Sequence, residues 1–387
     1  MSVTAAKGFA AAGVAAGIRR RGPDVALVRS LVPAVGGGMF TVNRVQAAPV
    51  KVSREHLALA EPQAVAINSG VANAATGAKG EADARATAVE VGRLLDLAPE
   101  QVIVLSTGVI GAPLPLDRLV PGLVNAAAAL SEQGGLSAAK AILTTDTKAK
   151  ESSVTGAGFT VGGMSKGSGM IHPNLATMLA VVTTDYPLEP GEPIELLRPA
   201  VDESFNSISV DGECSTNDAV ILLANGASGL ERTPASDLAF AAALRTVCAD
   251  LARQIVEDGE GATVFAEIAV TGAASDAEAR AIASRIATSP LVKTALFGRD
   301  ANWGRVLAAA GSAPYNGGYA QVDPELITLA YNDTLVLVGG APSEDEPDVS
   351  SPNCRIELDL GLGDGAAEYL TSDLSYDYVR INADYRS

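Results

Sequence analysis

The sequence predicts a layered α/β fold arranged in two lobes. The chain has 387 residues, which is long for a single core and sufficient for two. Segments with a helical period alternate with segments with a strand period, as in layered α/β proteins. Hydrophobic residues make up 48% of the chain and charged residues only 19%, with 39 glycines, so we expect an ordered protein rich in small side chains.

The individual elements follow from these periods. Apolar residues on one face predict a helix over 84–95, and a short apolar strand is predicted over 102–105, ahead of a helix that begins near Pro115. The strongest helical pattern covers 240–255, with Ser236 or Asp237 as its N-cap. Clean alternation predicts a strand over 264–270, and the tail over 374–381 is also strand-like, which places Asn382 and Ser387 on a terminal strand.

Two segments have the composition of irregular structure. One is rich in proline and glycine, and the other is acidic and contains proline. Residues 186–193 predict the end of the first lobe, near residue 190. Residues 339–352 are acidic and contain proline, which is typical of an exposed loop, here inside the second lobe.

The composition excludes several classes of function. A formal net charge of −17 argues against binding to nucleic acid or to an anionic membrane surface. The three cysteines are far apart and odd in number, and with two histidines in the chain we expect no metal site. The apolar stretch over 9–18 lacks a clear cleavage site for secretion, so a cytoplasmic location is expected.

Thr177 lies where a glycine-rich segment leads into an apolar strand. It is the only polar residue from Leu175 to Val182, and the preceding His172-Pro-Asn segment bends the chain. If the bond between Ala176 and Thr177 is cut, the freed α-amine, with an ordinary pKa of about 7.7–8.0, becomes a base for the hydroxyl. His172 is an alternative base. An ordinary strand threonine after a loop is the competing interpretation.

Ser106-Thr107-Gly108 closes the predicted strand over 102–105. The backbone N–H groups of such a turn can bind an anion or a developing oxyanion, although a plain strand-to-helix turn is equally compatible with the pattern. Lys166 lies in a glycine-rich segment that does not match the Walker pattern, because its lysine precedes a glycine. We therefore interpret Lys166 as a lone cation near Thr177 that can meet a carboxylate.

An acidic cluster, Glu257-Asp258-Gly-Glu260, follows the predicted helix over 240–255. Negative charge at a helix C-terminus is opposed by the helix dipole, at a cost of a few tenths to ~1 kcal/mol. This arrangement favours a site for a cationic ligand, and a solvated helix end is the alternative.

Segments spread over almost the whole chain together resemble those of the glutamate N-acetyltransferases, also called ornithine acetyltransferases, of arginine biosynthesis. They are Thr107-Gly108, Thr144-Thr145-Asp146-Thr147, GGMSKGSGMIHPNLATMLAVVTTD, FNSISVDGECSTNDAVILLANG, DGEGAT, DANWGRVLAAAG and YVRINADYRS. The resemblance implies an α/β fold related to the N-terminal-nucleophile hydrolases, with the active site between two lobes. It departs from the family pattern at Val71, Ala75 and Ala301.

The resemblance also implies roles for particular residues. The precursor is expected to cut itself between Ala176 and Thr177 into an α chain, 1–176, and a β chain, 177–387, which stay together as two copies of each. Thr177 is then the nucleophile, and Thr107 and Gly108 form the oxyanion hole. The substrate-contacting positions are Thr145, Lys166, Thr177, Glu260, Asn382 and Ser387.

The implied reaction moves the acetyl group of N2-acetyl-L-ornithine to L-glutamate through an acetyl-threonine intermediate. No cofactor is expected, and whether acetyl-CoA is a second acetyl donor stays open. Two other functions are compatible with the residues alone. One is a self-processing amide hydrolase or aminopeptidase of similar architecture, and the other is a Gly/Ala-rich binding protein without catalysis.

Overall fold

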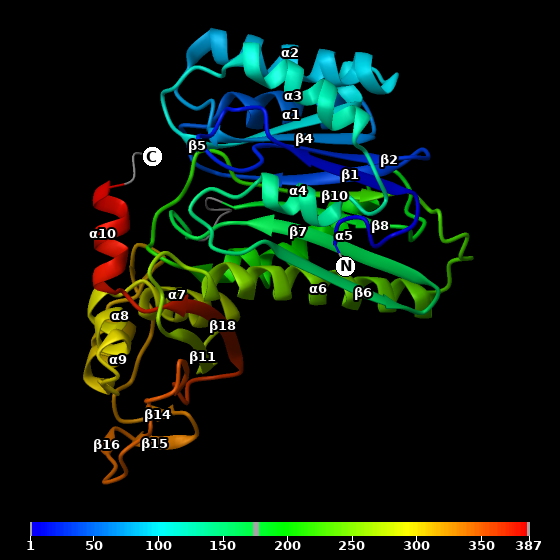
Figure 1. The fold of residues 1–387 in the computed structure, drawn as a ribbon. Coiled ribbons are helices and arrows are strands. Elements are labelled where there is room, and N and C mark those ends of the chain that lie inside the picture. Colours follow the sequence, from blue (N-terminus) through cyan, green and yellow to red (C-terminus); the bar gives the residue numbers. More distant parts are fainter. Residues whose placement is uncertain (1, 173–177, 385–387) are drawn as a thin grey trace. The chain divides into compact units, whose positions relative to one another are not determined.

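The computed structural model of the chain describes residues 2–172 and 178–384 (Figure 1). The chain divides into two compact units. The first contains the residues up to Asn206 together with Glu213–Ile255, and the second contains Ser207–Gly212 together with Val256–Tyr385. No helix in the described residues is long and apolar enough to cross a membrane.

Two sheets form the first unit. The four-stranded sheet has the order β1 (Phe9–Val14), β2 (Val25–Ser30), β4 (Ala64–Val71), β5 (Val102–Val109), with β4 and β5 parallel. The five-stranded sheet has the order β3 (Val35–Phe40), β10 (Ala219–Ala224), β8 (Leu179–Thr184), β7 (Phe159–Lys166), β6 (Lys150–Gly156), with β8 and β10 parallel. Strands β8 and β10 are buried along their whole length, as expected for the centre of a sheet covered on both faces.

The two sheets pack face to face, and helices cover their outer faces (Figure 1). One apolar cluster joins Ile67 and Ile103 of the four-stranded sheet to Val181 and Ile221 of the five-stranded sheet. A second cluster lies between the four-stranded sheet and helices α1 (Ala48–Leu59), α2 (Gly77–Leu95) and α3 (Leu116–Ala128). The other helices of this unit are α4 (Gly135–Ala141), α5 (Glu192–Asp202) and α6 (Pro234–Glu257). The layered α/β prediction is confirmed, as are the helices at 84–95, near 115 and at 240–255.

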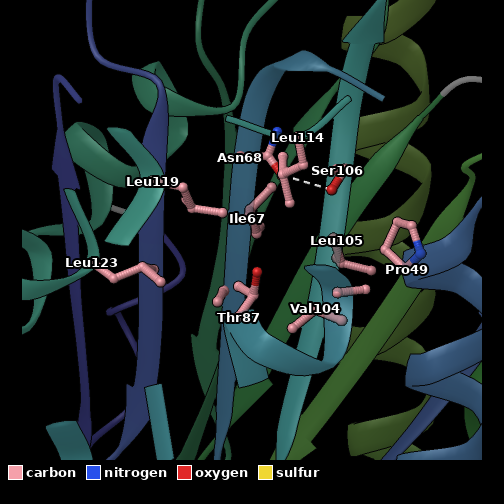
Figure 2. A pocket seen from close by; sticks show the side chains of 12 residues that line it. Pro49, Ile67, Asn68, Thr87, Val104, Leu105, Ser106, Leu114, Leu119 and Leu123 are labelled. Carbon is pink, nitrogen blue, oxygen red and sulfur yellow. Dashed lines mark hydrogen bonds between the residues drawn. The ribbon is translucent and has the colours of Figure 1, made fainter. Parts of the chain in front are cut away.

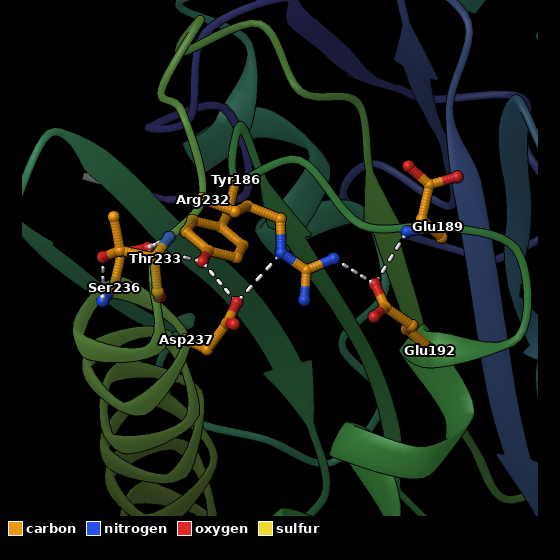
Figure 3. A network of polar contacts seen from close by, with 7 residues as sticks. All are labelled: Tyr186, Glu189, Glu192, Arg232, Thr233, Ser236 and Asp237. Atoms are coloured by element: carbon orange, nitrogen blue, oxygen red, sulfur yellow. Dashed lines mark hydrogen bonds and ion pairs between the residues drawn. The ribbon is translucent and has the colours of Figure 1, made fainter.

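The segment after β8 does not end the first unit, so the predicted lobe boundary near residue 190 is wrong. Tyr186 donates from its hydroxyl to Asp237 at 2.6 Å, and Arg232 bridges Asp237 and Glu192 at 2.9 and 2.6 Å (Figure 3). These contacts attach the proline-rich segment and the start of α5 to the start of α6, in the same unit.

Helix α6 begins earlier than predicted. Thr233 Oγ1 accepts from the backbone N–H of Ser236, and Ser236 Oγ accepts from the backbone N–H of Thr233 (Figure 3). This reciprocal capping satisfies free donors of the first turn, so Thr233 caps the helix and not Ser236 or Asp237.

The second unit contains a seven-stranded sheet and its helices. The strand order is β16 (Ala341–Pro342), β15 (Thr334–Val338), β14 (Thr328–Tyr331), β17 (Asn353–Asp359), β11 (Phe265–Ala273), β18 (Gly365–Ser372), β9 (Ile208–Ser209). The helices are α7 (Asp276–Ala287), α8 (Pro290–Phe297), α9 (Trp303–Ala310) and α10 (Tyr376–Asp384), and β12 (Pro314–Tyr315) pairs with β13 (Gly318–Tyr319). Strand β11 confirms the strand predicted over 264–270.

The C-terminal tail is a helix, α10, and the strand predicted over 374–381 is wrong. Strand β18 ends at Ser372, and Ser375 Oγ then accepts from the backbone N–H of Tyr378 at 3.2 Å. A serine that caps the third following N–H group is a typical helix start. Asn382 therefore lies on a helix and not on a strand, and Ser387 lies outside the described residues.

Candidate active site

Thr107 and Gly108 lie inside β5, near its carboxyl end, where they pair with Ser69 and Gly70 of the parallel strand β4, so the turn predicted over 106–108 is wrong. Gly108 has φ of +132°, a conformation that other residues rarely adopt, and it pairs with Gly70. A Cβ atom on Gly108 would lie 2.2 Å from the carbonyl carbon of Gly70. The strand segment predicted to bind an oxyanion therefore requires glycine at position 108.

A hydrogen bond between polar side chains links β4 and β5 just before Thr107. Ser106 Oγ donates to Asn68 Oδ1 at 2.6 Å (Figure 2). The cavity that these two residues help to line has a volume of about 10 Å³, close to the space that one water needs. This side of the strand pair is therefore packed, with no room for a substrate.

Asn217 and Asp218 connect β5, just before Thr107, to the start of β8. Asn217 Nδ2 donates to the carbonyl oxygen of Ser106 at 2.9 Å, and Asp218 Oδ1 accepts from the backbone N–H of Met178 at 2.9 Å. Two neighbouring residues thus bind the carbonyl group of Ser106 and the backbone N–H of Met178. Sequence reasoning assigned no role to this pair, although the polar run from 215 to 218 precedes a buried strand just as Thr177 does.

The predicted nucleophile and cleavage site, Ala176 and Thr177, lie outside the described residues. Their neighbours on both sides are described. Met178 is buried and hydrogen-bonded to Asp218, and burial lowers the pKa of His172, which favours the neutral imidazole. A neutral imidazole can accept a proton, so His172 stays the alternative base.

Lys166 is the last residue of β7 and pairs in register with Leu179, the first residue of β8. It is buried, and it is not the lone cation that the sequence predicted. Asp146 and Asp218 both act on it electrostatically, and Asp146 Oδ1 accepts from the backbone N–H of Gly167, the next residue, at 2.7 Å. The cation is therefore part of a buried charged cluster near the start of β8.

The segment that contains Thr145 is attached to the same glycine-rich corner. Thr145 Oγ1 and Ser168 Oγ lie 2.7 Å apart, and the Asp146 carboxylate accepts from Lys150 Nζ at 2.7 Å. Burial opposes the charge of Asp146, but the Lys166 and Lys150 ammonium groups hold its pKa well below its usual range. The structure therefore brings Thr145 and Lys166 together around an ionised carboxylate.

In the second unit, Glu260 and Asn382 are in direct contact. Asn382 Nδ2 donates to Glu260 Oε2 at 2.7 Å, and Glu260 is 9% exposed. Ser375 Oγ donates to the carbonyl oxygen of Gly261, which holds the loop after Glu260 against the start of α10. Within the predicted acidic cluster, Glu257 is exposed, whereas Asp258 and Glu260 are buried.

Asn217 and Asp218 thus connect the strand segment predicted to bind an oxyanion with the start of β8. The sequence comparison specifies the family, because the sequence model of the ArgJ family matches residues 10–387, and the chain therefore belongs to that family. The predicted resemblance is confirmed. The protein is thus an acyltransferase of arginine biosynthesis, and the amide hydrolase alternative is not favoured.

Curated relatives match over the full length. The chain is 47% identical over 400 residues to the arginine biosynthesis bifunctional protein ArgJ of Symbiobacterium thermophilum, covering 100% of this chain and 98% of the relative. It is also 47% identical to ArgJ of Streptomyces coelicolor, over 391 residues and 100% of both chains. Among solved structures, the ornithine acetyltransferase of Mycobacterium tuberculosis complexed with ornithine is 44% identical, over 45% of this chain and 96% of that chain, with a TM-score of 0.44.

Proposed function

We propose that the enzyme transfers the acetyl group of N2-acetyl-L-ornithine to the α-amine of L-glutamate, with Thr177 as nucleophile. The observation that supports this proposal is a pair of hydrogen bonds made by two adjacent residues: Asn217 donates to Ser106, directly before Thr107, and Asp218 accepts from Met178, directly after Thr177 in the sequence. A nucleophilic hydroxyl and N–H donors for the oxyanion are the two components that acyl transfer needs.

The first half-reaction transfers the acetyl group to the enzyme. After cleavage before Thr177, the Oγ atom attacks the acetyl carbonyl, and the free α-amine takes the hydroxyl proton. The Thr107 and Gly108 donors stabilise the tetrahedral oxyanion. The C–N bond then breaks, the α-amine returns the proton to the leaving nitrogen, and ornithine departs from an acetyl-threonine ester.

In the second half-reaction, the glutamate amine attacks the ester, its proton passes through the α-amine to the threonine oxygen, and N-acetylglutamate leaves. One site therefore accepts an ammonium tail and a carboxylate tail in turn. We assign the ammonium tail to Glu260, supported by Asn382, and the carboxylate tail to Lys166, with Thr145 beside it and Ser387 as a further contact. The opposite charges of Glu260 and Lys166 suit the two substrates.

Acetyl-CoA is a second acetyl donor under this proposal, because the curated relatives are named bifunctional. It would acylate the same threonine and leave as the thiol. We also infer a cytoplasmic enzyme made of two α and two β chains, and no bound cofactor is part of the mechanism.

The test follows the enzyme through both half-reactions. Purified protein is incubated with N2-acetylornithine alone, and the mass of the fragment that begins at Thr177 is measured. A gain of one acetyl group, lost again when glutamate is added, is the expected result. A chain that stays uncut, or an ester that water discharges as fast as glutamate does, would contradict the proposal. Replacing N2-acetylornithine with acetyl-CoA tests the second donor.

A further inference from the structure

A groove in the first unit runs along the outer edge of β3, the edge strand of the five-stranded sheet. Its volume is about 550 Å³, within the range of small-molecule sites, and its lining comes mainly from β3, α1 and α5. Met39, Leu57 and Ile194 contribute apolar surface from these three elements. None of the residues that line the groove has a role in the mechanism above.

Two arginines line the same groove, Arg54 on α1 and Arg198 on α5. The Arg54 guanidinium lies 5.5 Å from the centre of the Phe40 ring, and Arg198 is exposed. Neither arginine forms an ion pair with any residue that the structure describes. Asp202 also lines the groove, and its carboxylate accepts from Asn206 Nδ2 at 2.8 Å. Guanidinium groups without a carboxylate partner suit a phosphate ligand, which they bind through two parallel hydrogen bonds.

The backbone of β3 also offers hydrogen-bonding groups to this groove. The N–H of Thr41 donates to the carbonyl oxygen of Asp218 at 3.0 Å. Because the bonds of an antiparallel pair alternate, the N–H and C=O groups of Gly36 and Gly38 point away from β10. The N–H of Gly36 donates to Glu61 at 3.0 Å, whereas Gly38 lines the groove. A ligand with amide groups can therefore pair with the strand edge at Gly38.

The groove lies at the same end of the sheet as the start of β8. Phe40, which lines it, pairs in register with Ala219, and Ala219 pairs with Leu179, the first residue of β8. Two strand spacings separate Phe40 from Leu179, which is about 10 Å. Leu179 follows Thr177 by two positions in the sequence. A ligand in the groove thus needs a long arm to bring a reactive group to this end of the sheet.

We propose that the groove binds the nucleotide end of acetyl-CoA. Arg54 and Arg198 would bind its phosphate groups, and its pantetheine arm, which contains two amide groups, would run along the edge of β3 at Gly38 towards the start of β8. Acetyl-CoA is a donor only under the proposed function, on which this inference therefore rests. N2-acetylornithine has neither phosphates nor a pantetheine arm, so the two donors differ in their need for the groove.

The test compares acetyl-CoA with S-acetyl-N-acetylcysteamine, a short thioester without phosphates, with glutamate as acceptor. The readout is the ratio of kcat/KM for acetyl-CoA to that for the short thioester, which does not depend on the fraction of folded protein. In Arg198→Gln this ratio should fall roughly ten- to a hundredfold, through KM for acetyl-CoA, as expected when a charge-assisted hydrogen bond is lost. Arg198→Lys keeps the charge and should keep most of the ratio.

A competition experiment tests the same site without a change in catalysis. Adenosine 3′,5′-bisphosphate carries the nucleotide end of the donor without its arm. It should compete with acetyl-CoA in the wild type and much more weakly in Arg198→Gln. Arg54→Gln should have the same effect, although Arg54 also donates to the carbonyl oxygen of Thr41 at 3.0 Å, so Arg198 is the cleaner position.

Arg118→Gln is the matched control. Arg118 is also exposed, but it lies on α3, does not line the groove, and donates to the carbonyl oxygen of Gly17 at 2.6 Å. Its replacement should leave the donor ratio unchanged. An unchanged ratio in Arg198→Gln, an equal fall in Arg118→Gln, or a wild type that uses N2-acetylornithine but not acetyl-CoA would overturn the inference. A wild type that transfers acetyl groups from no donor would instead count against the proposed function.

Discussion

Asn217 donates from Nδ2 to the carbonyl oxygen of Ser106 at 2.9 Å, although the two residues lie 111 positions apart in the chain. The same amide donates to the carbonyl oxygen of Ala72 at 2.6 Å. One buried side chain thus links the ends of β4 and β5 to the start of β10. Because the residues that follow Ser106 in β5 supply the proposed oxyanion donors, Asn217 should control their position.

Asn217→Asp should lower kcat by about ten- to a hundredfold and leave KM nearly unchanged. The carboxylate cannot donate to the two carbonyl groups and repels them, which displaces Thr107 and Gly108. Losing one oxyanion donor outright typically costs about 10²–10³ in rate. Self-cleavage should slow as well. Steady-state kinetics and a time course on denaturing gels measure both effects.

Asn225→Asp is the control for this prediction. Asn225 directly follows the other end of β10 and also donates to main-chain carbonyl groups, those of Lys7 and Gly8. It should lower stability without changing kcat. Equal kinetic losses in the two variants would show that Asn217 acts only through the stability of the strand.

Thr177→Ala should abolish both self-cleavage and acetyl transfer, because one hydroxyl performs both attacks. Thr177→Ser should keep part of each, since it retains a hydroxyl and, once cut, a free amine. Gel analysis and N-terminal sequencing test the cut, which should give a fragment that starts at Thr177. Wild-type transfer by the alanine variant would place the nucleophile elsewhere.

Glu260→Gln should impair acylation by N2-acetylornithine more than discharge by glutamate. Glutamine keeps an acceptor for the Asn382 amide and removes only the charge, so the loss should be about 1.5–3 kcal/mol, or ten- to a hundredfold, for the cationic substrate. Rapid-mixing measurements time the two half-reactions separately. Equal losses would mean that Glu260 contacts the amino-acid head that both substrates share.

The unfolding free energy should depend on pH through Lys293. Its ammonium group is buried and donates to Thr371 Oγ1 at 3.0 Å and to the carbonyl oxygen of Ser372. Burial lowers its pKa to about 8, against the opposing influence of Asp373 and Asp211. The unfolded lysine, with a pKa of about 10.4, binds more protons in this interval, so stability should rise with pH.

Between about pH 8 and 10, the wild type should therefore gain stability relative to Lys293→Met, by up to about 1.4 kcal/mol per pH unit. Urea unfolding of both proteins at pH 8, 9 and 10 gives the difference. Replacing the exposed Lys51 by Met should leave the pH dependence of the wild type intact. Parallel curves for the wild type and Lys293→Met would contradict the prediction.

Much of the fold could be predicted from the sequence because local periodicity decides it. Helix α6 and strand β11 have long regular patterns and are buried as expected. The tail was misjudged because its apolar residues fit a strand equally well, and the deciding feature is the hydroxyl of Ser375 at the helix start. The break near residue 190 was misjudged because Arg232, far along the chain, holds that segment in the first unit.

The site was predictable only in part. Thr107, Gly108 and Lys166 stand beside glycine in short segments, where the pattern itself is unusual. Asn217 and Asp218 were missed because their role depends on hydrogen bonds to strands far away in sequence. The prediction of a lone cation at Lys166 is wrong because no local pattern reveals that Asp146, twenty residues earlier, accepts from the N–H of Gly167.

The strand order of the five-stranded sheet has a consequence for a chain cut before Thr177. The central strands β8 and β10 would belong to the second fragment, and β7 and β3, which pair with them on either side, to the first. Backbone hydrogen bonds between the strands of the two fragments would hold them together. The fragments could separate only if the hydrogen bonds in the middle of the sheet broke. Cutting the peptide would thus leave the two fragments bound to each other until this sheet itself unfolds.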